Sequence, residues 1–335
     1  MTTIGVIGAG YWGTNYLRVL DDLPQANLRW CVDLVEERLD TVRDRYPEIG
    51  TTTEYSDIID DVDAVCIATP PQTHEEIAID FLTHGVGVLV EKPLALTEKS
   101  GQRMVDAASK TDTPLLVGHI FEYHQAVRDL RNLVSEGDLG DLHYLHAQRT
   151  GLGPIREDVS ALWDLCPHDV SIFTYLLDST PTAVQCIGHS FLQDVPDAVY
   201  LFVEFENGIE AAVQASWLHP EKTRQVTLIG DEKMAVFDDT DPDRLLQIFE
   251  KTVDREQPQG LDEFQFTTRE GDVWLPYVEH REPLKMQAEH FIDCVEGNAQ
   301  PFTDGREGLE VVKVLQAAER SLENGGTRTP IKQTK

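Results

Sequence analysis

A short apolar strand, a glycine-rich turn and a helix open this chain, and together they restrict its fold more than any other segment. The apolar run over residues 4–7 leads into residues 8–13, GAGYWG, which match G-x-G-x-x-G. A helical stretch over 15–21 and a second apolar run over 28–32 follow. This order of strand, turn, helix and strand predicts the first part of a doubly wound, dinucleotide-binding sheet.

Each glycine of the turn has a separate physical role. Gly8 permits the tight turn out of the strand, Gly10 lets backbone approach a pyrophosphate, and Gly13 allows close packing of helix on strand. The helix N-terminus supplies amide donors and a positive dipole end for the phosphates. Asp33 follows the second apolar run, where a carboxylate accepts hydrogen bonds from ribose hydroxyls and repels a 2′-phosphate. The predicted cofactor is therefore NAD.

The 335 residues suffice for two domains with separate cores. Up to about residue 120, apolar strands alternate with helical stretches, whereas strands dominate from 142 to 237. We therefore predict an α/β Rossmann domain with a doubly wound parallel sheet over 1–120. An α+β domain for substrate binding and oligomerisation, with a large open and mainly antiparallel sheet, is expected over 121–335. Late helices over 284–296 and 305–323 complete it.

One strand of that second sheet is apolar on both faces. In residues 198–205, Val199, Leu201 and Val203 alternate with Tyr200 and Phe202. Helices can cover one face only, so the other is expected to meet a second subunit. We predict a homodimer or homotetramer formed through this sheet.

The charge of the chain bears on its environment. It carries 59 acidic and 28 basic residues, a net charge of −31. Self-repulsion of this size destabilises a compact state, but at 1 M salt the Debye length is only about 3 Å. We therefore predict a halophile's protein from a salt-rich cytoplasm, with an acidic surface of no special meaning as the alternative. Bases are too few to neutralise nucleic-acid phosphates, so no nucleic-acid partner is expected.

Neither a membrane partner nor a metal is predicted. No apolar run approaches the roughly 20 residues that span a bilayer. The first strand begins at once, so we expect no signal peptide. The five cysteines show no C-x-x-C or metal-ligand spacing, which predicts small buried thiols in a reducing cytoplasm.

Polar or cyclic residues stand at the ends of three predicted parallel strands, where ligands of such sheets collect. These segments are residues 69–74, 91–93 and 118–119. Lys92 lies between an apolar run and a proline, so its backbone is fixed and its ammonium can hydrogen-bond a nicotinamide ribose and a substrate hydroxyl. A lysine that only extends from a strand end into solvent is the alternative.

A second motif, WDLCPHD over residues 163–169, places Asp164 and His168 one helical turn apart on a shared face. A histidine held by a carboxylate is a common general base. Pro167 suits this interpretation only if the helix begins nearby, because proline is tolerated in the first turn. A helix-start carboxylate beside an unrelated interface histidine is the alternative.

These motifs together make the sequence resemble the glucose–fructose oxidoreductase/inositol dehydrogenase (Gfo/Idh/MocA) family over almost its whole length. The resemblance implies that Lys92, Asp164 and His168 form the catalytic group, with the proton going to either Lys92 or His168. The residues expected to bind the cofactor are Gly8, Gly10, Tyr11, Trp12, Gly13, Asp33, Thr69, Pro70, Gln72, His74, Glu91 and Lys92.

Residues 10–13, 118–123 and 216–222 are similar to a subgroup associated with nucleotide-sugar modification. The resemblance implies an NAD-dependent dehydrogenase acting on C3 of a UDP-N-acetylhexosaminuronic acid. The alternatives are a dehydrogenase of a free polyol or aldose, such as inositol, glucose or xylose, and a non-catalytic NAD-binding regulator. Cations near the motifs suit an anionic sugar, although they could equally pair with surface carboxylates. The expected substrate-binding residues are His119, Tyr123, Arg149, Arg156, Trp163 and Lys222.

Overall fold

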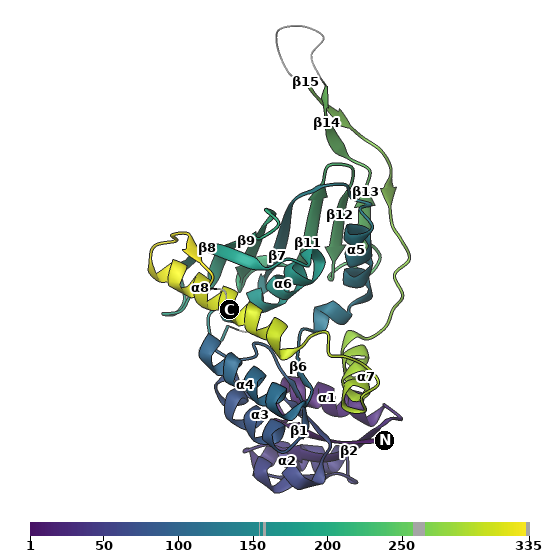
Figure 1. Ribbon diagram of the computed structural model, residues 1–335, viewed down its shortest axis with the longest axis vertical. Helices are drawn as coiled ribbons and strands as arrows, with labels where there is room; N and C mark the ends of the chain where they lie inside the picture. The colour runs from purple at the N-terminus through teal and green to yellow at the C-terminus, as the bar shows by residue number, and fades with distance from the viewer. Residues whose placement is uncertain (154, 157–158, 257–264, 333–335) are drawn as a thin grey trace. The chain divides into compact units, whose positions relative to one another are not determined.

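The computed structural model describes residues 1–153, 155–156, 159–256 and 265–332. The chain folds into two compact units (Figure 1). The first holds Met1–Tyr123 and Arg281–Gln316, and the second holds His124–His280 and Ala317–Lys335. The chain first passes from one unit to the other after Tyr123, close to the boundary predicted at residue 120. Residues 281–316 return to the first unit, whereas the sequence predicted both late helices within the second domain.

Six parallel strands form the sheet of the first unit, in the order β3-β2-β1-β4-β5-β6. This is the order of a dinucleotide-binding doubly wound sheet, which confirms the predicted Rossmann fold. The order reverses between β1 and β4, so a ligand is expected beyond the carboxyl ends of these strands. The strands are β1 (Thr2–Ile7), β2 (Ala26–Val32), β3 (Gly50–Thr52), β4 (Ala64–Ile67), β5 (Gly87–Val90) and β6 (Leu115–Val117).

Helices cover this sheet with their apolar sides. Leu17 and Leu20 of α1 share a core with Ile4 of β1 and with Phe291 of α7, all at most 1% exposed. Burying each such side chain contributes roughly 1.5–3 kcal/mol. The helices are α1 (Tyr11–Asp21), α2 (Glu36–Arg45), α3 (His74–Thr83), α4 (Glu98–Thr111), α7 (Pro283–Val295) and the start of α8 (Gly305–Glu323), with the short turns η1 (Tyr55–Asp61), η2 (Pro71–Thr73) and η3 (Ile120–Tyr123).

A nine-stranded sheet dominates the second unit, in the order β16-β13-β12-β11-β7-β10-β9-β8-β17. Its neighbours pair antiparallel except β7 with β10, so the expected mainly antiparallel sheet is confirmed. The strands are β7 (Leu142–Leu152), β8 (Pro181–His189), β9 (Ala198–Phe205), β10 (Glu210–Ser216), β11 (Leu218–Gly230), β12 (Met234–Asp238), β13 (Leu246–Phe249), β16 (Val273–Trp274) and β17 (Thr329–Pro330). The strands β14 (Thr252–Glu256) and β15 (Gln265–Arg269) form a separate pair.

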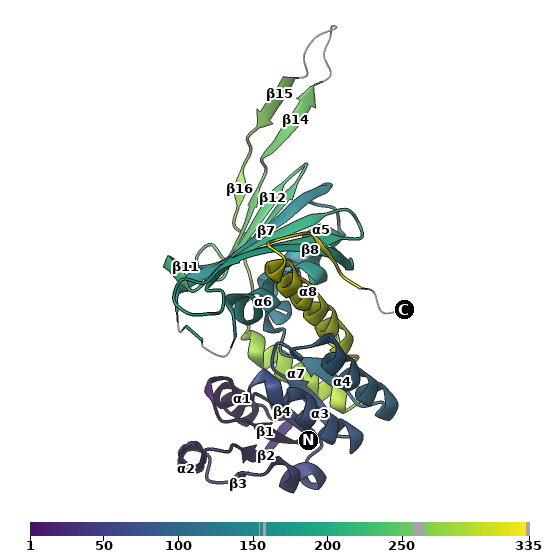
Figure 2. The same ribbon diagram turned by 90° about the vertical axis from the view of Figure 1, so that its left-hand side faces the viewer.

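The helices α5 (Gln125–Ser135) and α6 (Ala161–Leu177) lie on one face of this sheet (Figure 2). Along β9, Val199, Leu201 and Val203 point to that face and are fully buried. Tyr200 and Phe202 point to the opposite face and are 44% and 46% exposed. The sheet is therefore apolar on both faces at β9, as the sequence predicted.

Two further expectations concern cysteines and membranes. All five cysteines are buried free thiols, as expected, and burial raises the pKa of Cys31 to about 12. None of the helices in the described part of the chain is long and apolar enough to cross a membrane.

Candidate active site

The glycine-rich turn leaves β1 as the sequence predicts. Gly8 has φ +97°, a conformation that side-chain-bearing residues rarely adopt. A Cβ on Gly13 would lie 1.7 Å from the Gly8 carbonyl oxygen, so only glycine lets α1 pack this close. A Cβ on Gly10 would have no other atom within 4 Å, so the backbone of Gly10 is open to a ligand. These features fit a dinucleotide pyrophosphate at the N-terminus of α1.

Asp33 follows β2 and links the turn to the next loop. Its Oδ2 accepts the Ala9 N–H at 2.7 Å, and its Oδ1 accepts the Val35 N–H at 2.8 Å. The Arg38 guanidinium donates to Oδ2 at 3.3 Å. A carboxylate offers about four acceptor positions, so Oδ1 can still accept from a ribose hydroxyl. The predicted contact with the adenosine ribose is compatible with this geometry.

Two alanine variants separate nucleotide binding from packing. We expect Gly13→Ala to lower the melting temperature and weaken NADH binding at least about 100-fold, because its Cβ meets backbone. Gly10→Ala should keep the wild-type melting temperature yet bind NADH about tenfold or more weakly, because its Cβ occupies the approach of the pyrophosphate. Thermal unfolding and titration of NADH fluorescence measure both. Wild-type affinity in Gly10→Ala would contradict this assignment of the turn.

The ends of β4 and β5 are joined by His74. Its Nδ1 lies 3.1 Å from the Pro93 carbonyl oxygen and its Nε2 lies 2.9 Å from that of Thr69. The ring is fully buried, and this burial lowers the pKa of His74. His74 thus binds the two strand-end segments to each other in this structure. Its predicted contact with the cofactor stays a prediction, as do those of the exposed Pro70 and Gln72 and the half-buried Thr69.

Lys92 is half-buried directly after β5, and its peptide bond to Pro93 is cis. The preceding residue, Glu91, is 7% exposed and is held inside the unit. Its Oε1 accepts the Tyr16 hydroxyl at 2.9 Å and its Oε2 accepts the Lys92 N–H at 3.2 Å. Burial raises the pKa of Glu91, while the nearby Lys92 ammonium opposes that shift. The backbone of the lysine is therefore fixed by its own neighbour.

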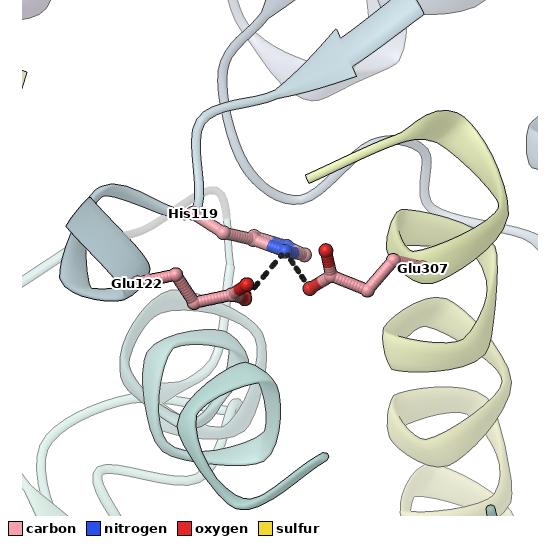
Figure 3. Close-up of side chains that lie close together, drawn as sticks. All are labelled: His119, Glu122 and Glu307. Carbon is pink, nitrogen blue, oxygen red and sulfur yellow. Dashed lines mark hydrogen bonds and ion pairs between the residues drawn. The ribbon is translucent and has the colours of Figure 1, made fainter. Parts of the chain in front are cut away.

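A histidine and two carboxylates converge beyond β6 (Figure 3). Nδ1 of His119 lies 2.8 Å from Glu307 Oε1 and 3.7 Å from Glu122 Oε1. Ligand atoms of this kind could hold a divalent cation. However, 2.8 Å is the length of a charge-assisted hydrogen bond, so the imidazole N–H takes that place. We assign the cluster to hydrogen bonding. His119 is 1% exposed, and its predicted contact with substrate stays a prediction.

The helix α6 carries the second predicted motif. Asp164 and His168 lie one turn apart on it and both are half-buried. The helix begins at Ala161, so Pro167 lies inside it rather than in the first turn, and that expectation was wrong. Proline lacks the N–H that would bond the carbonyl four residues earlier, that of Trp163.

Asp164 is held by two donors of the second unit. Its Oδ1 accepts from the Arg156 guanidinium at 3.2 Å, and its Oδ2 accepts from the Trp217 indole N–H at 3.3 Å. Trp163 is 6% exposed and donates its own indole N–H to Glu319 at 3.2 Å. These contacts fix the carboxylate beside His168. Trp217 was not predicted as a site residue, and in the sequence it stands out only as part of residues 216–222.

Arg149 is buried and paired inside the second unit. It is 5% exposed and makes two hydrogen bonds to Asp169, at 2.9 and 2.8 Å. Tyr123 is also buried, with its hydroxyl 2.8 Å from His290 and 3.0 Å from Thr303. Among the predicted substrate-binding residues, Lys222 is exposed and Arg156 is half-buried. Contacts of all these residues with a sugar stay predictions.

A doubly wound sheet with a glycine turn and an acidic residue after β2 defines a dinucleotide-binding protein of the α/β class. Residues 2–119 match the model of the GFO_IDH_MocA family, described as an oxidoreductase family with an NAD-binding Rossmann fold. Residues 127–236 match the model of the GFO/IDH/MocA C-terminal domain. The chain belongs to the Gfo/Idh/MocA family of oxidoreductases, and its first unit is an NAD-binding Rossmann domain.

Three similar proteins illustrate the range of this family. UDP-N-acetylglucosamine 3-dehydrogenase of Acidithiobacillus ferrooxidans is 29% identical over 54% of this chain and 57% of its own length. Inositol 2-dehydrogenase of Corynebacterium glutamicum is 27% identical over 63% and 66%, so the chain spans less than two thirds of these curated relatives. The WlbA dehydrogenase of Bordetella pertussis, solved with NADH and UDP-GlcNAcA, shares the fold with a TM-score of 0.82 at 19% identity, over 99% of this chain and 98% of that one.

Proposed function

We propose that this protein is an NAD-dependent dehydrogenase that oxidises the C3 hydroxyl of a UDP-N-acetylhexosaminuronic acid. The observation that carries the proposal is that the chain holds both a Rossmann unit, in which Glu91 holds the backbone of Lys92 after β5, and a second unit whose helix α6 carries Asp164 and His168 one turn apart. A regulator that only senses NAD needs none of these three side chains. The 3-dehydrogenase relative and the UDP-GlcNAcA complex of WlbA support the nucleotide sugar as substrate.

The proposed chemistry assigns one task to each side chain. Bound NAD supplies the hydride acceptor. His168, kept in place with Asp164, takes the proton of the sugar hydroxyl, and Lys92 binds that hydroxyl and stabilises negative charge developing on its oxygen. Lys92 could instead take the proton, with His168 as its hydrogen-bond partner. The pH profiles described in the Discussion distinguish the two assignments.

The anionic part of the substrate needs cations, and we propose two of the four predicted near the motifs for this task. Arg149 already binds Asp169 through two hydrogen bonds in the interior. We therefore assign the sugar carboxylate or diphosphate to Arg156, which is 38% exposed, and to the exposed Lys222. The role of Arg149 in this proposal is to support α6.

Substrate oxidation tests the proposal directly. The protein, purified in molar KCl, is mixed with NAD and UDP-N-acetylglucosaminuronic acid, and NADH absorbance is followed, with inositol, glucose and xylose as comparisons. NADH formed only with the nucleotide sugar would support the assignment. Turnover only with inositol would favour the activity named for the Corynebacterium glutamicum relative. No turnover, with protein-bound NADH excluded by its fluorescence, would reject a dehydrogenase of these sugars.

We also propose that two copies of the chain associate through the uncovered face of the nine-stranded sheet. The face carries Tyr144, Ile187, Tyr200 and Phe202, which are 42–48% exposed. Antiparallel pairing puts Tyr200 directly opposite Ile187, so these side chains form one apolar surface. A face of this kind is typical of a surface that a second subunit covers.

The mass in solution tests this association. We expect a dimer or tetramer in molar KCl by light scattering. Tyr200→Lys with Phe202→Lys should halve that mass, to a monomer or a dimer respectively. The net charge of −31 supports a salt requirement, so dilution into low salt should lower the melting temperature of the wild type. A monomeric wild type at micromolar concentration would contradict the proposed interface.

A further inference from the structure

A buried hydrogen bond connects the helix after the glycine-rich turn to the segment that carries Lys92. Tyr16 of α1 is 1% exposed, and its hydroxyl donates to Oε1 of Glu91 at 2.9 Å. Oε2 of the same carboxylate accepts the backbone N–H of Lys92 at 3.2 Å. One carboxylate thus receives one hydrogen bond from α1 and one from the backbone of the lysine.

Neighbouring groups leave this carboxylate little room to move. Gln287 of α7 is fully buried, and its Oε1 lies 3.4 Å from the Tyr16 hydroxyl. The same amide donates to the Val117 carbonyl of β6 at 3.3 Å. A Cβ on Gly118 would lie 3.1 Å from Glu91 Oε2, so glycine at that position makes space for the carboxylate. The arrangement ties α1, α7 and the ends of β5 and β6 together.

The hydrogen bond from Tyr16 also bears on the charge of Glu91. Burial favours the neutral acid, whereas the Lys92 ammonium and the Tyr16 hydroxyl favour the carboxylate. The other titratable groups that act electrostatically on this pair are Cys66 of β4, His119 beyond β6 and Tyr123 of η3. Loss of one donor from a buried carboxylate therefore changes both its position and its ionisation.

We propose that Tyr16 is a positioning residue that acts on Lys92 through Glu91. The proposal rests on the proposed function, in which Lys92 binds the reacting hydroxyl. Tyr16 fixes the carboxylate, the carboxylate fixes the backbone and charge environment of the lysine, and the ammonium is thereby placed. The predicted contact of Glu91 with the cofactor stays a prediction beside this role within the protein.

Kinetics of two tyrosine variants test the proposal. Tyr55 of η1 donates to Asp80 at 2.7 Å, a second tyrosine–carboxylate hydrogen bond of the same unit that does not involve Lys92. We expect Tyr16→Phe to lower kcat about tenfold, since small misplacement of a catalytic group is costly. KM for the sugar and the Kd of NADH should stay within about twofold, because Tyr16 meets neither. Tyr55→Phe should leave all three unchanged.

A second readout does not depend on turnover. Limited reaction with acetic anhydride, read by mass spectrometry, gives the reactivity of Lys92 relative to the exposed Lys110. Only a neutral amine reacts, and a less ionised Glu91 stabilises the ammonium less, so Tyr16→Phe should raise this ratio at least about threefold. Tyr55→Phe should not change it.

The two readouts separate the two proposals. An unchanged labelling ratio in a folded Tyr16→Phe variant would overturn the role of Tyr16. If the wild type oxidises none of the sugars, the proposed function fails, and the labelling ratio alone decides whether Tyr16 controls Lys92. A raised ratio together with a lowered kcat at unchanged KM would support both.

Discussion

Replacing His168 by alanine is expected to lower kcat by about 10²- to 10⁴-fold, the usual contribution of a positioned general base. His168 lies on α6 one turn beyond Asp164, whose carboxylate is held by Arg156 and Trp217. In the proposed chemistry His168 is the base, so its removal acts on the rate of the chemical step. Lys92→Ala should cause a loss of similar size, because in the proposed chemistry the ammonium stabilises the developing oxyanion.

The pH dependence of these variants identifies the proton acceptor. A general base must be unprotonated, so activity falls as the pH drops through the pKa of that base. If His168 is the base, this acidic limb disappears in His168→Ala and persists in Lys92→Ala. The matched control is His143→Ala, an exposed histidine of β7 that should keep wild-type kcat. Near-wild-type kcat in His168→Ala at every pH would show that His168 does not act as the base.

The second large effect concerns stability. Arg149→Met removes the partner of Asp169, which is 1% exposed, and leaves a buried carboxylate without its guanidinium. Breaking a buried pair in this way costs about 3–5 kcal/mol. For a unit of this size that corresponds to a fall in melting temperature on the order of 10 °C. Thermal unfolding followed by circular dichroism in molar KCl measures it.

Two further variants show whether burial is the cause. Arg149→Met combined with Asp169→Leu removes both charges and should recover most of the lost stability, because no buried ion remains uncompensated. Arg224→Met breaks the pair with Asp239, in which the arginine side chain is 42% exposed, and should cost less than about 1 kcal/mol. Equal losses of stability for Arg149→Met and Arg224→Met would mean that burial does not make the Arg149–Asp169 pair more costly to break.

This stability effect changes how a substrate-binding test of Arg149 is interpreted. Before the structure, Arg149 and Arg156 were equivalent candidates for an anionic sugar. A raised KM in Arg149→Met would now follow from displacement of α6, so it would not show contact with substrate. Arg156→Ala and Lys222→Ala are the informative variants, since the Arg156 side chain is 38% exposed and Lys222 is exposed.

Most elements of the first unit follow from local sequence. The helix that begins in this unit at residue 305 has the predicted limits, 305–323. Buried parallel strands are nearly all apolar, and capping groups mark where helices begin. Asp304 accepts the N–H of Glu307 at 2.9 Å, as an aspartate at the start of a helix commonly does. The carboxylate of Glu307 instead binds His119, a partner 188 residues away that no capping pattern could indicate.

The helix α5 and the strands β3 and β13 to β17 were not predicted. β3 and β17 contain three and two residues, too few for a period to be visible. The position of Pro167 inside α6 is a comparable case, because the local rule places proline in a first turn. Tertiary packing of a buried helix outweighs a local preference of this size.

The sequence by itself determined the dinucleotide turn, the cofactor class, the parallel sheet and the family, because each depends on residue types at fixed short spacing. It also placed Lys92, Asp164 and His168 as candidates. Only the tertiary structure decided which charged groups are already satisfied inside the protein, as Arg149 is by Asp169 and Glu91 is by Tyr16. The reason is physical: a hydrogen bond between residues 20 or 75 positions apart depends on how elements pack, and local spacing carries no record of it.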